Sequence, residues 1–582
     1  MWGVFMKKNS TGFPSIDLTH DEGISYFKRK PFIPNLNIFN AVEMLSLFYR
    51  GSFAVDSLEL RVTFQELIDD SVRLSKSFKE LGVKADEIIT VSMPNLYQAL
   101  VVFLAANRIG ATITFLNSFA GSDEICHYIN EFESKIYINF DKNNEYNNDI
   151  FKKSCAKTII TLERNELNKR TFNDKKSYGY SDTISYEEFS GLSKFQKGMN
   201  IPALSSNHNA LILFTSGTTG APKSVVLTNK NIIAAAVYLK NTSSAGNKVG
   251  EKSLVCVPFT YPYGFSTSTL MSLMCGREVI LAPDLSLETI PVYYGKKPNI
   301  IFGSPAFLDL TMRAIPDGYD LSSANTFISG GDFLTVKKTN EGKDFFSKHG
   351  SKIEICNGSG NAETVSCGTN SYGLPIKPET AGRVLYGTSN IIIDSDTGKE
   401  LKYGEEGMLC VSGKHVFKEY YKNPEKTAES KFMYKGKEYF ETGTRGILHE
   451  DGYFELTGRD SRFYIIKTLN KVYCDRVQNI ITGIDIVSEC AVVKVPDKDM
   501  LYVNKAYIVL KPGVEQNEDV KEYIKECCKG VIKMAGTQDE AQLKSYEIPV
   551  YIEFVDELPR KKSEKIDYDF LEKDAEKKLV KK

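Results

Sequence analysis

ALILFTSGTTGAPKSVVLT, residues 210–228, places a loop of hydroxyl side chains and glycines between two short apolar runs. The runs at 210–214 and 224–227 are typical of β-strands. In the loop, glycines let backbone N–H groups face an anion, hydroxyl groups add uncharged donors, and Lys223 adds a positive charge. Pro222 stands where a Walker A loop has its second glycine, so this loop is of another kind. The stretch predicts a polyphosphate-binding loop, with an ordinary hairpin rich in Ser, Thr and Gly as the alternative.

The chain has 582 residues, too many for one compact core, which predicts two or more domains. Its 73 Lys and Arg residues nearly balance its 74 Asp and Glu residues, so no overall field favours nucleic acid or an anionic membrane. The longest apolar run, 99–116, includes Asn107 and Arg108 and predicts a buried helix and strand rather than a transmembrane segment. Eleven cysteines without metal-ligand spacing, behind an opening too short for a signal peptide, predict reduced thiols and a cytoplasmic location.

Helical and strand patterns alternate ahead of the loop. Thr63 begins a capping-box pattern, which predicts a helix that ends at Gly82. A strand at 88–92, a helix at 98–108 and a strand at 111–116 are predicted next. Such alternation predicts an α/β fold with helix-covered, mostly parallel sheets.

Three further segments carry structural predictions. Residues 141–198 are rich in Asn, Lys, Asp and Ser, with short strands such as 158–162, and we expect a surface excursion without function. Thr228 is expected to be the N-cap of a helix that runs to Leu239. A small α/β unit is predicted near the C-terminus, with strands at 463–467, 489–495 and 506–510 and a helix near 520–529.

TSGTTGAPK at 215–223 resembles the phosphate loop of the adenylate-forming superfamily, which includes acyl-CoA synthetases, adenylation domains of peptide synthetases and luciferases. The resemblance covers about residues 45–566. It implies a large N-terminal AMP-binding domain and a small, mobile C-terminal α/β AMP-binding domain. The expected bounds are a weakly patterned lead-in at 1–40, the large domain at 41–459, a hinge at Asp460 and Ser461, and the small domain at 462–582.

The resemblance also implies the roles of particular residues. Glu363 would hold Mg²⁺ on the ATP phosphates, as a hard oxygen ligand. Lys223 would support the phosphates, and Lys565 would bridge the carboxylate substrate and the α-phosphate. Asp332 would either accept from the adenine amino group or be solvated. The implied ATP-binding residues are Thr215, Ser216, Gly217, Thr218, Thr219, Gly220, Gly330, Gly331, Asp332, Asn357, Gly358, Ser359, Thr444 and Arg459.

Four positions depart from the family's motifs. Ser359 replaces a Tyr that stacks on adenine, and Ala362 replaces a Thr beside the α-phosphate. Thr444 replaces an Asp that binds the ribose hydroxyls, and Glu564 replaces a Gly just before the catalytic lysine. A hydrogen bond to a charged group contributes roughly 1.5–3 kcal/mol, so Thr444 is expected to weaken nucleotide binding. These departures keep open a degenerate, non-catalytic adenylate-binding protein.

Tyr261, Phe265 and Ser304 are expected to line the pocket for the carboxylic acid. Amino-acid-activating domains place an Asp at the position of Tyr261 to pair with the α-ammonium group, so Tyr261 argues against an α-amino acid. Together with Tyr263 and Phe307, these aromatic residues predict an apolar pocket for a fatty or aryl acid. The alternative is that some of the rings belong to the ordinary core.

The resulting prediction is an acid–thiol ligase of the AMP-forming acyl-CoA synthetase type. With ATP and Mg²⁺ it would convert a fatty or aryl acid to an acyl-adenylate and then transfer the acyl group to coenzyme A. The alternative acceptor is the phosphopantetheine of an acyl or peptidyl carrier protein, because loop 467–471 lacks the glycine at which the family approaches pantetheine. Neither a nucleic-acid partner nor a transmembrane segment is expected.

Overall fold

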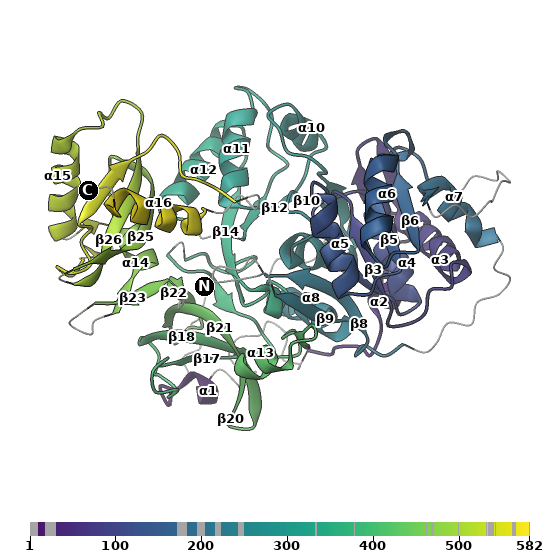
Figure 1. Ribbon diagram of the computed structural model, residues 1–582, viewed down its shortest axis with the longest axis horizontal. Helices are drawn as coiled ribbons and strands as arrows, with labels where there is room; N and C mark the ends of the chain where they lie inside the picture. Colours follow the sequence, from purple (N-terminus) through teal and green to yellow (C-terminus); the bar gives the residue numbers. More distant parts are fainter. Residues whose placement is uncertain are drawn as a thin grey trace.

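The computed structural model describes the chain apart from residues 1–9, 18–30, 171–182, 195–203, 216–222, 243–248, 332–333, 378, 460–461, 467–470, 499, 531, 534–539, 542, 562–565 and 581–582. The described residues form a large N-terminal domain and a smaller C-terminal domain at one end of the molecule (Figure 1). The predicted α/β fold, with a large N-terminal and a small C-terminal domain, is confirmed.

The first sheet carries the predicted phosphate loop. Within the described residues it has eight strands in the order β19-β9-β8-β4-β3-β5-β6-β7. Its strands from β8 to β7 are parallel, whereas β8 and β9 form an antiparallel hairpin and β19 pairs antiparallel with β9. The bounds are β3 Ile88–Ser92, β4 Thr112–Phe115, β5 Ile136–Phe140, β6 Thr158–Leu162, β7 Thr183–Ser185, β8 Asn209–Phe214, β9 Ser224–Thr228 and β19 Glu419–Tyr420.

The second sheet leads into two predicted site segments: the turn at Gly330 and Gly331, called the glycine turn below, and the motif that contains Glu363. In the described chain it has nine strands in the order β16-β15-β14-β13-β12-β10-β11-β1-β2, and those from β14 to β1 are parallel. The bounds are β1 Phe53–Ser57, β2 Leu60–Thr63, β10 Lys252–Val255, β11 Glu278–Leu281, β12 Ile300–Gly303, β13 Thr326–Ser329, β14 Glu354–Ser359, β15 Thr369–Asn370 and β16 Arg383–Val384.

Helix α4 (Tyr97–Arg108) joins the two sheets. Its residues from Tyr97 to Asn107 are buried, and it packs against β4 of the first sheet and β1 of the second. An apolar helix of this kind, buried all round, belongs inside a protein core. The other helices of the large domain are α1 Pro14–Asp17, α2 Ile38–Ser46, α3 Phe64–Glu80, α5 Ser122–Glu131, α6 Asn144–Lys153, α7 Tyr186–Gly191, α8 Asn229–Thr242, α9 Met271–Met274, α10 Thr289–Gly295, α11 Pro305–Ala314, α12 Val336–Lys348 and α13 Pro424–Glu429.

The local predictions ahead of the loop are confirmed. Helix α3 begins with a capping box, in which Glu66 N–H donates to Thr63 Oγ1 and Thr63 N–H donates to the Glu66 carboxylate. Gly82 follows its end with φ +79°, a left-handed conformation that glycine adopts readily. Helix α8 follows Thr228, whose hydroxyl accepts from Asn231 N–H at 3.2 Å.

The expected surface excursion at 141–198 is wrong in its described parts, although the strand predicted at 158–162 is confirmed as β6. It contains helix α6, strands β6 and β7, and helix α7. Strand β6 extends the first sheet by pairing parallel to β5, and its Ile159, Ile160 and Leu162 are fully buried. The polar composition comes from the surrounding residues, while these few β-branched and apolar side chains are enough to build an inner strand.

A third sheet, which is antiparallel, is formed by the last strands of the large domain. Among the described residues it runs β17-β18-β21-β20, with β22 beside β21. Its bounds are β17 Ser389–Ile393, β18 Glu406–Ser412, β20 Lys431–Tyr434, β21 Lys437–Leu448 and β22 Phe454–Arg459. The register of β21 and β22 sets Thr444 opposite Arg459.

The small domain confirms the predicted C-terminal unit, although the strand expected at 463–467 ends at Ile465. The bounds are β23 Phe463–Ile465, β24 Lys471–Tyr473, α14 Cys474–Thr482, β25 Val487–Asp497, β26 Leu501–Leu510, α15 Glu518–Lys529, β27 Ile532–Lys533, β28 Glu540–Ala541, β29 Tyr551–Phe554 and α16 Tyr568–Val580. It lies beside α12, where Lys337 Nζ donates to Val487 O at 2.9 Å (Figure 1). Across the described residues, no helix has the length and apolar character needed to span a bilayer.

Candidate active site

The two ends of the phosphate loop are tied together at the top of the β8–β9 hairpin. Thr215 N–H donates to Lys223 O at 3.0 Å, and Lys223 N–H donates back to Thr215 Oγ1 at 3.1 Å. Ser216, Gly217, Thr218, Thr219 and Gly220 lie outside the described residues. The hairpin therefore presents Thr215 at the carboxyl end of β8 and the exposed Lys223 just before β9.

Glu363 lies in a 3₁₀ turn, Ala362–Thr364, just after strand β14. Its side chain is buried, and Tyr420 Oη donates a hydrogen bond to Glu363 Oε1 at 2.7 Å. The backbone is held as well, because Phe417 N–H donates to Glu363 O at 2.7 Å. Burial raises the pKa of Tyr420 above its ordinary value, and the neighbouring charge of Glu363 raises this pKa further.

Tyr420 also reaches the phosphate loop. Lys223 Nζ lies over the Tyr420 ring, 4.8 Å from its centroid, in a cation–π arrangement. Three side chains from separate segments thus meet: Lys223 at the end of the loop, Tyr420 on β19, and Glu363 after β14. Sequence reasoning singled out Lys223 and Glu363 but gave Tyr420 no role, because nothing in its local spacing marks a contact with Glu363.

The backbone beyond Glu363 adopts an unusual conformation. Val365 and Ser366 have φ of 55° and 56°, in the left-handed region that β-branched residues avoid. Thr267 Oγ1 donates to Val365 O at 2.9 Å and so supports this turn. The turn reverses the chain immediately after Glu363. Neither position is a glycine, so the sequence gives no signal that predicts the turn.

The glycine turn follows strand β13. Gly330 N–H donates to Gly303 O at 3.1 Å, and Gly331 has φ +87°. A Cβ atom on Gly330 would lie 2.9 Å from the Tyr263 ring, so glycine is required for this close approach. Asp332 lies outside the described residues.

The Asn357–Ser359 segment belongs to strand β14. Asn357 Nδ2 donates to Leu334 O at 3.0 Å, which ties the strand to the chain beyond the glycine turn. Gly358 and Ser359 pair with β15 through Asn370 and Thr369. These residues therefore line up with the glycine turn at the carboxyl ends of neighbouring parallel strands, where α/β sheets bind ligands.

The Thr444 motif joins the same region. Asn361 Nδ2, just before Glu363, donates to Thr442 O at 2.7 Å, and Thr444 N–H donates to Thr442 Oγ1 at 3.1 Å. Arg459 is opposite Thr444 in the strand register. The structure thus brings together the Glu363, Thr444 and Arg459 motifs.

The residues expected to line the acid pocket have different environments. Phe265 is fully buried, with its ring centroid 4.6–4.9 Å from those of Phe103, Phe115 and Phe259. It is a core residue in this structure, as the alternative interpretation held. Ser304 caps helix α11 by accepting from Phe307 N–H at 3.2 Å, and Tyr261 is half-buried ahead of a π-helical turn at Tyr263–Leu270.

Tyr263 fills the space beneath the glycine turn. Its buried hydroxyl donates to Ile328 O at 2.5 Å. Phe307 is also buried and stacks on Phe327 with ring centroids 6.4 Å apart. The rings of Phe265 and Phe307 therefore pack against other aromatic residues, and the role of this region as the pocket for the acid stays a prediction.

Lys565 and the hinge residues Asp460 and Ser461 lie outside the described residues. On either side of Lys565 the chain is anchored, because Arg560 and Ile566 form an antiparallel bridge. Lys561 is paired with Asp569 at 2.6 Å.

The donor set at Glu363 fits Mg²⁺. A carboxylate is a hard oxygen ligand, and Mg²⁺ in nucleotide sites is held by one or two carboxylates together with phosphates and water. The described residues contain no group of three or more His, Cys, Asp or Glu side chains that could hold a metal ion by themselves. Glu363, with one oxygen already bound to Tyr420, suits a metal ion that arrives with ATP.

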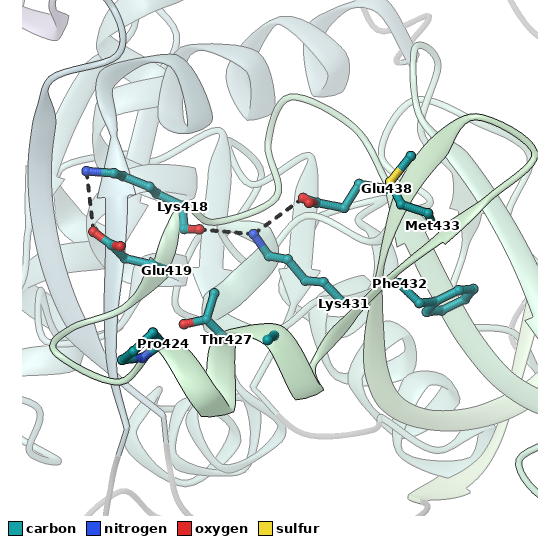
Figure 2. Close-up of a pocket in the computed structure, with 9 residues that line it drawn as sticks. Lys418, Glu419, Pro424, Thr427, Lys431, Phe432, Met433 and Glu438 are labelled. Carbon is teal, nitrogen blue, oxygen red and sulfur yellow. Dashed lines mark hydrogen bonds and ion pairs between the residues drawn. The ribbon is translucent and has the colours of Figure 1, made fainter.

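A surface pocket of about 440 Å³ lies on the outer side of the segment that carries Tyr420 (Figure 2). Within it, Lys431 Nζ donates to the carbonyls of Phe417 and Lys418, both at 3.0 Å. Burial lowers the pKa of Lys431. The pocket includes no predicted site residue; its lining is Lys418, Glu419, Pro424, Thr427, Ala428, Lys431, Phe432, Met433 and Glu438.

The two parallel sheets, the phosphate-loop hairpin and the Glu363 motif define an enzyme of the adenylate-forming class. A family model described as AMP-binding enzyme matches residues 49–421, and one described as AMP-binding enzyme C-terminal domain matches residues 476–565. The chain belongs to the AMP-binding enzyme family. The predicted superfamily and the prediction that the chain is an enzyme are both confirmed.

Similar proteins cover most of the chain. A long-chain-fatty-acid–CoA ligase of Bacillus subtilis (strain 168) is 25% identical over 544 residues, covering 91% of this chain and 92% of that protein. A luciferin 4-monooxygenase of Luciola mingrelica is 26% identical over 527 residues, covering 87% and 88%. The crystal structure of ATP-bound MatB from Rhodopseudomonas palustris is 23% identical with a TM-score of 0.78, covering 93% of this chain and 99% of that one, and shows the shared fold.

Proposed function

We propose that this protein uses ATP to activate a carboxylic acid and transfers the acyl group to the thiol of coenzyme A, with a fatty or aryl acid as the substrate. The observation that carries the proposal is the meeting of Lys223, Tyr420 and Glu363 beside the phosphate loop. Family membership and full-length similarity to a fatty-acid–CoA ligase support the same reaction.

In the first step a carboxylate oxygen would attack the α-phosphorus of ATP. The bond from that phosphorus to the oxygen bridging the β-phosphate breaks, and pyrophosphate leaves with the electron pair. Lys223 and the loop from Thr215 would hold the phosphates, and Glu363 would hold the magnesium ion that comes with them. When bound, Mg²⁺ offsets the negative charge of the phosphates.

In the second step a thiolate would attack the carbonyl carbon of the acyl-adenylate. The carbon–oxygen bond to AMP breaks, AMP leaves, and a thioester forms. Lys565 is proposed to act in the first step, where its charge would bridge the two approaching anions, and Arg459 to bind the nucleotide.

A panel of carboxylates assayed for pyrophosphate release, with and without coenzyme A, tests this proposal. We expect release with fatty or aryl acids, and thioester formation when coenzyme A is present. Release driven by an α-amino acid would contradict the argument from Tyr261. Pyrophosphate release without transfer to coenzyme A would indicate a carrier protein as the acceptor, and no release with any acid would favour the non-catalytic alternative.

A further inference from the structure

We infer that Tyr420 is a positioning residue for adenylation: its hydroxyl holds one oxygen of Glu363 so that the carboxylate is aimed at the metal ion that accompanies ATP. The inference rests on the proposed function, because it assigns a role within that same site. The side chain of Tyr420 is buried, and it contacts Glu363 only because the fold brings these two distant segments together.

Tyr420 is held on a rigid support. Its strand, β19, pairs with β9 at Glu419↔Val226 and Tyr420↔Val225. Backbone bonds continue on both sides, since Lys418 N–H donates to Val226 O at 3.1 Å and Tyr421 N–H donates to Ser224 O at 2.8 Å. The strand that carries the tyrosine is therefore bound directly to the strand that begins at the end of the phosphate loop.

A second anchor comes from the outer side of this segment. Lys431 Nζ binds the carbonyls of Phe417 and Lys418, as Figure 2 shows for Lys418. On the inner side, Phe417 N–H donates to the backbone carbonyl of Glu363. The segment 417–421 is thus fixed to Glu363 at the backbone and again through the Tyr420 hydroxyl.

The hydroxyl and the ring of Tyr420 have separate tasks. The hydroxyl donates to Glu363 Oε1 at 2.7 Å, which restricts rotation of the carboxylate. The ring lies under Lys223 at 4.8 Å and so positions the cation at the end of the phosphate loop. Replacement by Phe removes only the first contact, and replacement by Leu removes both.

Binding of Mn²⁺ and ATP, with free Mn²⁺ counted by electron paramagnetic resonance, tests the hydroxyl without requiring turnover. We expect Tyr420→Phe to weaken Mn²⁺ binding in the presence of ATP by roughly 10–100-fold, the effect typical of losing a partner that orients a metal ligand. Tyr421→Phe is the matched control, because Tyr421 neighbours Tyr420 and its ring packs against Phe132 instead. This control should bind Mn²⁺ and ATP as the natural protein does.

The Mg²⁺ dependence of pyrophosphate release gives a second measurement. A general loss of packing would not raise the Mg²⁺ requirement alone. In Tyr420→Phe the Mg²⁺ concentration needed for half-maximal pyrophosphate release should rise, while KM for the acid and the melting temperature stay unchanged. Tyr420→Leu should additionally raise KM for ATP, because Lys223 loses its support.

The outcomes separate this inference from the proposed function. Equal Mn²⁺ binding by Tyr420→Phe and the natural protein would overturn the inference even if the enzyme is fully active. Weaker Mn²⁺ binding by Tyr420→Phe, in a protein that releases no pyrophosphate with any acid, would support the inference and reject the proposed function. No binding of Mn²⁺ with ATP by the natural protein would overturn both.

Discussion

At the scale of single residues, two side chains are unusual for their positions: Thr444 is uncharged where the family has an Asp, and His415 is an ionisable group inside the core. Thr444 lies opposite Arg459 in an antiparallel register, at the position where the family has an Asp. His415 is fully buried, and burial lowers its pKa from 6.5 to about 4. We expect Thr444 to affect nucleotide binding and His415 to affect the free energy of unfolding, so each gives a separate prediction.

Thr444→Asp should bind ATP roughly 10–100-fold more tightly than the natural protein, because a hydrogen bond to a charged group contributes roughly 1.5–3 kcal/mol. Titration calorimetry with ATP and Mg²⁺ measures the affinity. Thr444→Asn is the matched control, since it has the same shape without the charge. Equal or weaker binding by the Asp variant would show that Thr444 does not stand at the ribose position.

His415 should make the free energy of unfolding depend on pH. The unfolded chain takes up a proton near pH 6.5 and the folded protein only near pH 4, so stability is greatest above pH 6.5 and falls as the pH drops toward 4. Between pH 7.5 and pH 5 the expected loss is about 2 kcal/mol. Urea unfolding at both values measures it.

The His415→Gln variant should lack this part of the pH dependence, whatever its absolute stability. His127→Gln is the control, because the His127 side chain is 71% exposed. A natural protein and a His415→Gln variant with the same slope between pH 7.5 and 5 would contradict the prediction.

At the scale of secondary-structure elements, local signals place helix ends and strands correctly. The capping box at Thr63 and the hairpin β8–β9 are both visible in short stretches of sequence, since their hydrogen bonds join residues close in the chain. The segment 141–198 shows the limit of such signals. The apolar run at 158–162 predicts strand β6, but the parallel pairing with β5 that places this strand inside the first sheet is not visible in local sequence.

Thr63→Ala should lower the free energy of unfolding by about 1 kcal/mol, the usual cost of losing an N-cap oxygen. The alanine leaves Glu66 N–H without the Thr63 oxygen that it contacts at 3.3 Å. Thr63→Ser keeps that oxygen and should retain most of the stability. Chemical denaturation of both variants measures the difference, and equal stability of the Ala and Ser variants would refute the capping argument.

At the scale of the whole molecule, the described contacts between the small domain and the large one include two side-chain interactions. Lys337 of α12 binds Val487 O, and the Arg445 guanidinium lies 4.4 Å from the centre of the Tyr473 ring. Relative motion is the usual expectation for two domains of one chain unless their interface is large and hydrophobic. With such motion, Lys565 is proposed to take part in adenylation and to be absent from the transfer step.

Lys565→Ala should slow pyrophosphate release by on the order of 10²–10³, the cost of one lost electrostatic contact in a transition state. Transfer from synthetic acyl-adenylate to coenzyme A should be preserved, because Lys565 is proposed to serve adenylation alone. Single-turnover assays of the two steps provide the measurement. Lys561→Ala is the control, since Lys561 is paired with Asp569; equal loss of both steps in Lys565→Ala would indicate a structural role.

The sequence by itself determined the strands of the phosphate-loop hairpin, the capping box, the α/β class and the family, since each depends on short-range spacing. Tertiary structure alone decided that Phe265 belongs to the core and that Tyr420 meets Glu363, 57 residues away. Such contacts arise where β19 pairs with β9 and the chain after β14 turns back at Val365. Local patterns record the conformation that a segment prefers, whereas the neighbours of a buried side chain depend on how distant segments pack.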